Sequence, residues 1–254
     1  MDITTKEMAQ MTWQEIEQCI KEGYGIILPI GSTEQHGPAL PISTDAICAR
    51  EVSLGAAENT KMLVAPTIQY GYRSRPLSGG GATFPGTTNL SGHTLICVIE
   101  DILEEFARMG FKKVVVLSMH MENQNFIYEG SYLVSRRHPD MKIMVMESAF
   151  GDIQENIMDV LFPDGFPGWA REHAACMEVS IMLYRHPELV HFDRAVNDNS
   201  EEYPFYDVLP PDPRFFTKSG TLWHAREATI EKGKLIWEEI IKQAGAAINK
   251  EFPI

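Results

Sequence analysis

The sequence predicts an α/β fold in which a mainly parallel β-sheet is flanked by α-helices. Short apolar runs of strand type alternate with longer stretches of helical periodicity. The clearest apolar run, at residues 113–118, lacks the apolar/polar alternation of a half-exposed strand, so a sheet covered on both faces is expected. Polar, ligand-type residues follow two of the apolar runs, and open parallel sheets bind ligands beyond the carboxyl ends of their strands.

Each element has its own signal. Thr12 and Glu15 form a capping box that opens a helix reaching about Lys21. A short apolar run follows at 25–29, and a helical pattern comes after Thr44 and Asp45 and reaches residue 58. The alternation then continues through a strand at 62–66, an amphipathic helix at 91–109, the strand at 113–118, a helix at 125–137 and a strand at 142–147.

The second half contains helical patterns at 174–184 and 225–250. Between them, residues 197–220 form a proline-rich irregular segment, which we expect to be a subunit-contact arm or an active-site flap. Residues 1–254 are expected to make a single domain.

Composition limits the possible partners and compartment. The formal net charge of −13 argues against nucleic acid and anionic membranes, both of which require basic surfaces. The first ten residues lack a signal-peptide pattern, and no apolar run is long enough to span a bilayer. The four cysteines have no CxxC spacing and are expected to be reduced. A cytoplasmic protein that acts on a small molecule is the expectation.

Five residues have the pattern of a two-metal centre: Glu34, His36, Asp45, His120 and Glu122. Side chains at i and i+2 of an extended segment point the same way, so each acid/His pair can reach one cavity. Asp45 has two oxygens with which to bridge two ions. Imidazole and carboxylate ligands without thiolate suit Zn²⁺ or Mn²⁺. The alternative is a turn-rich loop with solvated acids and a core histidine.

A second group lies where the helical pattern at 174–184 begins. His173 is the candidate proton carrier, because the imidazole pKa fits proton transfer near neutrality. Its alternative role is a histidine that caps or packs at a helix start. Glu172 stands beside it, also able to project into a cleft. Trp169 is either a lid over the substrate or an anchor for its loop.

Residues 78–81 (SGGG) are rich in glycine, and Ser78 and Gly79 begin a loop after the second predicted strand. Without Cβ atoms, backbone N–H groups of this loop can approach a ligand closely. A tight turn without a ligand is the alternative. The segment is not a phosphate loop, since no Lys-Ser/Thr follows, and the chain contains no GxSxG nucleophile elbow.

Taken together, these motifs resemble those of the creatininase (creatinine amidohydrolase) family. The resemblance is carried by GSTEQHGP at 31–38, Thr44-Asp45, QYGY at 69–72, SGGG at 78–81, FPGTT at 84–88, HMEN at 120–123 and GW…EH at 168–173. It implies an α/β fold, a homohexamer and two divalent ions held by the five residues above. It also implies hydrolysis of a cyclic amide C–N bond, with His173 as proton shuttle and Glu122 helping to position the water. Substrate contacts are expected at Ser78, Gly79, Met121, Trp169 and Glu172.

Three positions depart from the pattern of enzymes that open creatinine. The chain has Met121 where those enzymes carry Tyr, Ala170 where they carry Asp, and no Trp at 148–150. The leading expectation remains hydrolysis of creatinine to creatine. The alternatives are a formamide or cyclic-ketone hydrolase on the same scaffold and a non-catalytic metal-binding subunit, which the presence of His173 disfavours.

Overall fold

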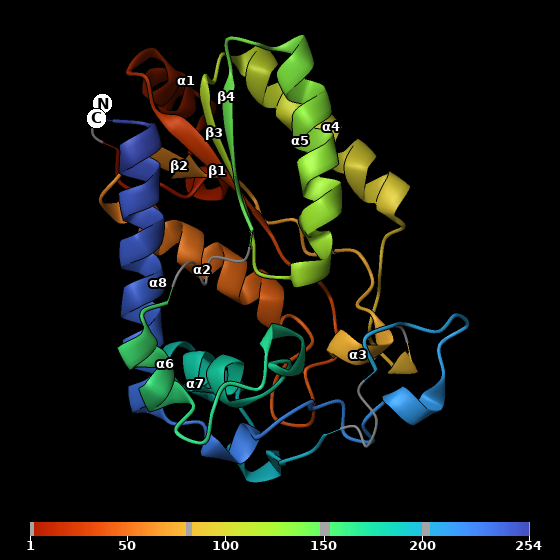
Figure 1. The fold of residues 1–254 in the computed structure, drawn as a ribbon. Helices are drawn as coiled ribbons and strands as arrows, with labels where there is room; N and C mark the ends of the chain where they lie inside the picture. The colour runs from red at the N-terminus through yellow and green to blue at the C-terminus, as the bar shows by residue number, and fades with distance from the viewer. Residues whose placement is uncertain (1–2, 80–82, 148–152, 200–203, 254) are drawn as a thin grey trace.

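Four parallel strands form the sheet, in the order β2-β1-β3-β4. The computed structural model describes residues 3–79, 83–147, 153–199 and 204–253. The strands are β1 (Gly25–Ile30), β2 (Met62–Val64), β3 (Lys113–Ser118) and β4 (Lys142–Met146), so all four predicted strands are confirmed. The two central strands, β1 and β3, run side by side and end at the same edge of the sheet (Figure 1).

Helices cover both faces of the sheet, as predicted (Figure 1). One core contains Val115 and Leu117 of β3, and the other contains Val114 and Val116. Because successive residues of a strand point to opposite faces, burial on both sides explains why this run is continuously apolar. The first core is completed by α2 (Thr44–Glu58), α7 (Cys176–Arg185) and α8 (Ile230–Glu251), and the second by α1 (Trp13–Lys21), α4 (Gly92–Met109) and α5 (Gln124–Arg137).

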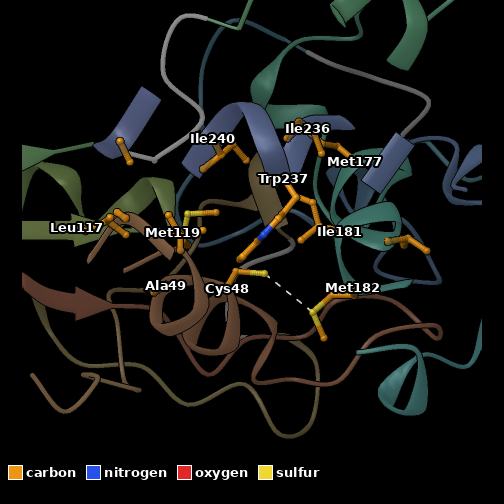
Figure 2. Close-up of a cluster of buried hydrophobic side chains, with 14 of the residues drawn as sticks. Cys48, Ala49, Leu117, Met119, Met177, Ile181, Met182, Ile236, Trp237 and Ile240 are labelled. Carbon is orange, nitrogen blue, oxygen red and sulfur yellow. Dashed lines mark hydrogen bonds between the residues drawn. The ribbon is translucent and has the colours of Figure 1, made fainter. Parts of the chain in front are cut away.

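Figure 2 shows the first core, where Trp237 of α8 packs among α2 and α7. The Cys48 thiol lies 3.9 Å from the sulfur of Met182. Two core residues, Met119 and Met177, also line the cavity described below. The cavity floor is therefore continuous with close-packed core, which holds the polar residues above it in place.

Several helix boundaries differ from the sequence expectation. The Thr12 capping box is present. The last helix begins at Ile230, because Thr229 caps it by accepting a hydrogen bond from the backbone N–H of Lys232; residues 225–227, predicted as helix, form a separate 3₁₀ turn. Two short helices were not predicted: α3 (Pro76–Gly79), at the start of the glycine-rich loop, and α6 (Glu155–Leu161). Residues 80–81 of that loop and 148–150 lie outside the described residues.

The four cysteines are free thiols, as predicted. Within the described ranges, no helix combines the length and the apolar character needed to cross a bilayer.

The end of β1 is pressed against the start of α2. A Cβ atom at Gly31 would lie 2.3 Å from the backbone nitrogen of Ala46, so only glycine permits this approach. The contact brings the segment after β1 beside the first turn of α2, where Asp45 lies.

Candidate metal centre and catalytic cavity

Asp45 lies at the centre of the site, buried in the first turn of α2. Its Oδ1 is 3.1 Å from Nε2 of His36, and its Oδ2 is 3.1 Å from Nδ1 of His120. The two oxygens of one carboxylate therefore face two different imidazoles. That is the geometry expected of a carboxylate shared by two ions.

The first candidate ligand group consists of Glu34, Asp45 and His120, all buried. Glu34 follows β1 and His120 follows β3, so the parallel pairing of these strands brings them together. Glu34 Oε2 lies 3.1 Å from His120 Nδ1. One potential ligand atom from each residue lies within 4.8 Å of the others, close enough to surround a single ion.

The second candidate group consists of His36, Asp45 and Glu178. Glu178 Oε2 lies 3.7 Å from His36 Nε2 and accepts a hydrogen bond from the backbone N–H of Ala174 at 2.6 Å. The sequence did not predict Glu178 as part of the site. It is the only charged residue in the helical stretch 174–184, and that isolation was the available signal.

Both ring nitrogens of the two histidines have defined environments. His36 Nδ1–H donates to the carbonyl of Glu34 at 3.1 Å, and His120 Nε2–H donates to the carbonyl of Tyr72 at 2.8 Å. The other nitrogen of each ring faces the carboxylates. Metal-ligating histidines are commonly held in this way by a second hydrogen bond.

Unsatisfied buried atoms converge on the same place. Glu34 Oε1, His36 Nε2 and Asp45 Oδ2 are buried without a hydrogen-bond partner among the described residues. Buried polar atoms normally have partners, so this cluster requires a further group. Divalent cations fit, because the three atoms are two carboxylate oxygens and an imidazole nitrogen.

The electrostatics agree with a cation site. Burial opposes the charged forms of His36 and His120, yet the facing carboxylates raise the pKa of both well above its ordinary value. Burial likewise opposes ionisation of Asp45, but the two imidazoles hold its pKa below its ordinary value. The carboxylates that face the two histidines therefore concentrate negative charge where a bound cation would be stabilised.

Glu122 lies on the other side of His120. Its Oε2 is 3.6 Å from His120 Nε2, whereas Glu34 and Asp45 face Nδ1. It is in neither ligand group. The physical reason is that residues 121–123 form a 3₁₀ helix, η3 (Met121–Asn123), so the expected i, i+2 alternation of an extended segment does not apply here.

Ser78 and Gly79 of α3 support two of the acids. The Ser78 hydroxyl donates to Glu122 Oε1. A Cβ atom at Gly79 would lie 2.2 Å from Glu34 Oε1, so the absence of a side chain makes room for Glu34. Both residues therefore lie next to the predicted site: Ser78 contacts Glu122, and Gly79 leaves room for Glu34.

Gln35 is a buried residue that sequence analysis did not assign to the site. Its amide nitrogen donates to the carbonyls of Gly79 and Gly220, each at 2.9 Å. The amide oxygen accepts from the backbone N–H of Gly37 at 2.9 Å. One side chain thus ties together three segments around the ligand groups. Its position between Glu34 and His36 was the signal.

His173 lies beside this amide. Its Nε2 is 2.8 Å from the backbone carbonyl oxygen of Gln35 and 2.9 Å from the Gln35 amide nitrogen. Since both amide hydrogens are directed at carbonyls, His173 Nε2 carries a proton and donates it to the Gln35 carbonyl. The same nitrogen lies 4.0 Å from Glu34 Oε1, and the rings of His173 and His36 are 4.5 Å apart. His173 could join Glu34 and His36 around an ion, but its Nε2 lone pair is not available in this arrangement.

A cavity of about 260 Å³ opens over these groups. Met121, Trp169 and Glu172, three of the residues expected to contact the substrate, line this cavity. Trp169 is 41% exposed and packs edge-on against Phe166 at 4.8 Å, so it borders the cavity while anchoring its loop. The remaining lining residues are Glu34, Asp45, Ser78, Met119, His120, Glu122, Gln124, Glu147, His173, Met177 and Glu178.

Glu172 is buried, and burial is the main reason that the pKa of its carboxyl is raised from 4.5 to about 8. Its Oε1 accepts from the backbone N–H of Met177. A carboxyl with a raised folded-state pKa binds more protons when folded, so it removes stability as pH rises from 4.5 to about 8.

Glu172→Gln, which keeps the acceptor and cannot ionise, is therefore expected to gain stability over the wild type at about pH 8 and little at about pH 5. Thermal melts of both proteins at both pH values check this. Equal differences at the two pH values would contradict it.

Comparisons with known proteins agree with the geometry. A family model described as creatinine amidohydrolase matches residues 9–248. The chain is 39% identical to creatinine amidohydrolase of Pseudomonas putida, over 97% of each chain. It is 26% identical to a mycofactocin precursor peptide peptidase of Mycolicibacterium smegmatis, over 90% of this chain and 85% of that one.

The fold matches solved creatininase structures. A mutant creatininase complexed with creatine superposes with a TM-score of 0.95 at 37% identity, covering 99% of this chain and all of the other. A manganese creatininase matches with a TM-score of 0.94 at 37% identity and the same coverage. The family model, the sequence relatives and the solved structures agree: the chain is a hydrolase of the creatininase family.

Proposed function

We propose that the protein hydrolyses the C–N bond of a cyclic amide, with creatinine and water giving creatine as the leading reaction, and that two divalent ions, Zn²⁺ or Mn²⁺, serve as cofactors. The observation that carries this proposal is Asp45, whose two oxygens face His36 and His120 in two overlapping ligand groups. The match to a manganese creatininase, and to another described as Zn-Zn, supports the choice of metals.

The proposed ligands are Glu34, Asp45 and His120 for one ion and His36, Asp45 and Glu178 for the other. When bound, the ions would lower the pKa of a water molecule and polarise the amide carbonyl. The protein residues hold the ligand atoms in place through carbonyl hydrogen bonds to the rings of both histidines.

Glu122 and His173 would handle the protons. Glu122 is oriented by Ser78 and is in neither ligand group, so its carboxylate is available to take a proton from the attacking water. His173 holds a proton at Nε2, 4.0 Å from Glu34 Oε1. We propose that Glu122 passes the proton from the water to the His173 imidazole, and that the resulting imidazolium delivers a proton to the departing ring nitrogen and returns to its neutral form. Water oxygen bonds to the carbonyl carbon, the C–N bond breaks, and the products are a carboxylate and the protonated nitrogen.

A substrate panel tests the proposal. Metal-reconstituted protein should turn over creatinine faster than formamides, cyclic ketones or short peptides. The panel includes ketones and peptides because relatives include a 3-dehydro-scyllo-inosose hydrolase of Thermotoga maritima, 32% identical over 46% of this chain and 36% of that one, besides the peptidases. A faster reaction with any other class would replace creatinine as the substrate.

The paired variants Glu178→Gln and Glu122→Gln distinguish a ligand from a proton carrier. Glu178→Gln is expected to reduce bound metal by about one ion per chain, because a neutral amide is a poor ligand for the second site. Glu122→Gln is expected to keep both ions and to lower kcat by roughly 10²-fold or more. Metal analysis and kinetics on the two proteins check this. If Glu122→Gln instead loses the ion, Glu122 is the ligand that the sequence predicted.

We also propose that the protein assembles as a homohexamer. The irregular segment, described at 197–199 and 204–220, exposes Phe205 (101%) and Leu209 (78%), and apolar side chains this exposed favour a contact between subunits. Light scattering is expected to give six times the 28.6 kDa chain mass. Phe205→Ser with Leu209→Ser should shift the mass downward, and an active wild-type monomer would contradict the assembly.

A further inference from the structure

Acidic residues dominate the wall of the catalytic cavity. Beyond the candidate metal ligands, Glu122, Glu147 and Glu172 line it, and the described lining residues include no lysine or arginine. Arg73 and Arg75 line a neighbouring cavity of about 670 Å³, which shares Met121, Glu122 and Gln124 with the first. The catalytic cavity therefore disfavours an anionic substrate group and favours one that donates hydrogen bonds.

Two of these three acids already have local roles. Glu122 accepts from Ser78 beside His120. Glu172 is buried and accepts from the backbone N–H of Met177 through Oε1. Its Oε2 is buried without a hydrogen-bond partner among the described residues, which independently indicates that a hydrogen-bonding group is missing from this wall.

Glu147 differs from both because it is exposed at the rim. It is the first residue after β4, and its Oε2 accepts from the side-chain amide of Gln124, the first residue of α5. Gln124 also lines the cavity. This hydrogen bond orients the carboxylate of Glu147, which also lines the cavity. A positioned, negatively charged carboxylate therefore lies at the rim.

We propose that Glu147 is a specificity-determining residue, whose carboxylate accepts a hydrogen bond from an exocyclic amino or imino group of a cyclic guanidine substrate. This rests on the proposed cyclic-amide hydrolysis. The apolar side chains of Met121 and Trp169 line the same cavity and suit the faces of a flat ring. The ring amide lies toward the metal ligands, and the guanidine N–H groups lie toward Glu147.

A matched pair of rings isolates this contact. Creatinine and 1-methylhydantoin have the same ring and methyl group, but the exocyclic nitrogen of creatinine is replaced by a carbonyl oxygen. A carboxylate attracts the N–H donor and repels the oxygen, so Glu147 should produce discrimination between the two. A neutral glutamine can donate to the oxygen and should reduce that discrimination.

The experiment measures the dissociation constants of both rings for the metal-loaded protein by calorimetry, with kcat and KM for creatinine in parallel. The proteins are wild type, Glu147→Gln and a control, Glu155→Gln, which alters an exposed acid in α6 outside the cavity lining. Glu147→Gln is expected to weaken creatinine binding by about 10-fold, the lower range for a hydrogen bond to a charged group, because the residue is exposed. Binding of 1-methylhydantoin should be unchanged or tighter, and the control should match wild type.

The outcomes separate this inference from the proposed function. If Glu147→Gln weakens both rings equally and lowers the melting temperature, Glu147 only joins β4 to α5, and the inference is overturned. An unchanged ratio of the two constants also overturns it, as does wild-type protein that binds neither ring. If wild type binds creatinine selectively through Glu147 but does not hydrolyse it, the inference stands and the proposed reaction fails.

Discussion

Asp45→Ala is expected to abolish turnover and to lower bound metal from about two ions per chain to less than one, since a shared carboxylate of a two-metal site serves both ions. The two oxygens of Asp45 face different ligand groups, so removing them leaves each group with one acid and one imidazole. No other substitution in the site is expected to affect both ions so directly. Metal analysis after gel filtration, together with a creatinine assay, gives the result.

Asp101→Ala is the matched control, because Asp101 is an exposed aspartate within a helix, α4, far from the ligand groups in the chain. It should retain both ions and full activity. An Asp45→Ala protein that keeps two ions and turns over normally would remove the shared-carboxylate centre from consideration.

His173→Ala is expected to retain both ions while turnover falls by roughly 10²–10⁴-fold, the usual contribution of a positioned acid or base. The physical reason is that His173 Nε2 donates its proton to the carbonyl of Gln35 and does not offer a lone pair to an ion. His36→Ala should behave differently, losing metal and activity together, because its Nε2 faces two carboxylates.

Metal content, melting temperature and kcat measured on both variants separate the roles. If His173 only packs at the start of α7, its removal should lower the melting temperature and leave turnover per metal-loaded chain nearly unchanged. Loss of an ion from His173→Ala would instead make it a third ligand of the group that contains Glu34 and His36.

The sequence predicted the sheet well because each strand is marked by a short apolar run that can be recognised locally. The strand at 113–118 is a short, mainly apolar run, and the candidate ligands Glu34, His36 and His120 follow β1 and β3. The position of Glu34, His36, Asp45 and His120 around one point follows from parallel pairing of those two strands and from the short path to α2. The relative positions of these residues can be predicted from strand direction and side-chain alternation alone.

Glu178 and Gln35 could not be identified by the same reasoning. Glu178 reaches His36 only because α7, from a distant part of the chain, packs beside α2 and α8. The spacing of residues in the sequence contains no information about that packing. Gln35 was within a recognised motif, but its role depends on two distant segments, at Gly79 and Gly220. Glu122 was predicted from extended alternation, which the 3₁₀ helix at 121–123 interrupts.

The place of Glu178 in α7 also has a consequence for synthesis of the protein. Residues 34, 45 and 120 emerge from the ribosome well before residue 178, and α8, which packs with α7 in the core, is made later still. At the usual rate of about 5–20 residues per second, the 58 residues between His120 and Glu178 take roughly 3–12 s to add. For that interval the nascent chain can offer one complete ligand group but not the second. The second ligand group is therefore completed only after the first, once α7 has been added to the chain.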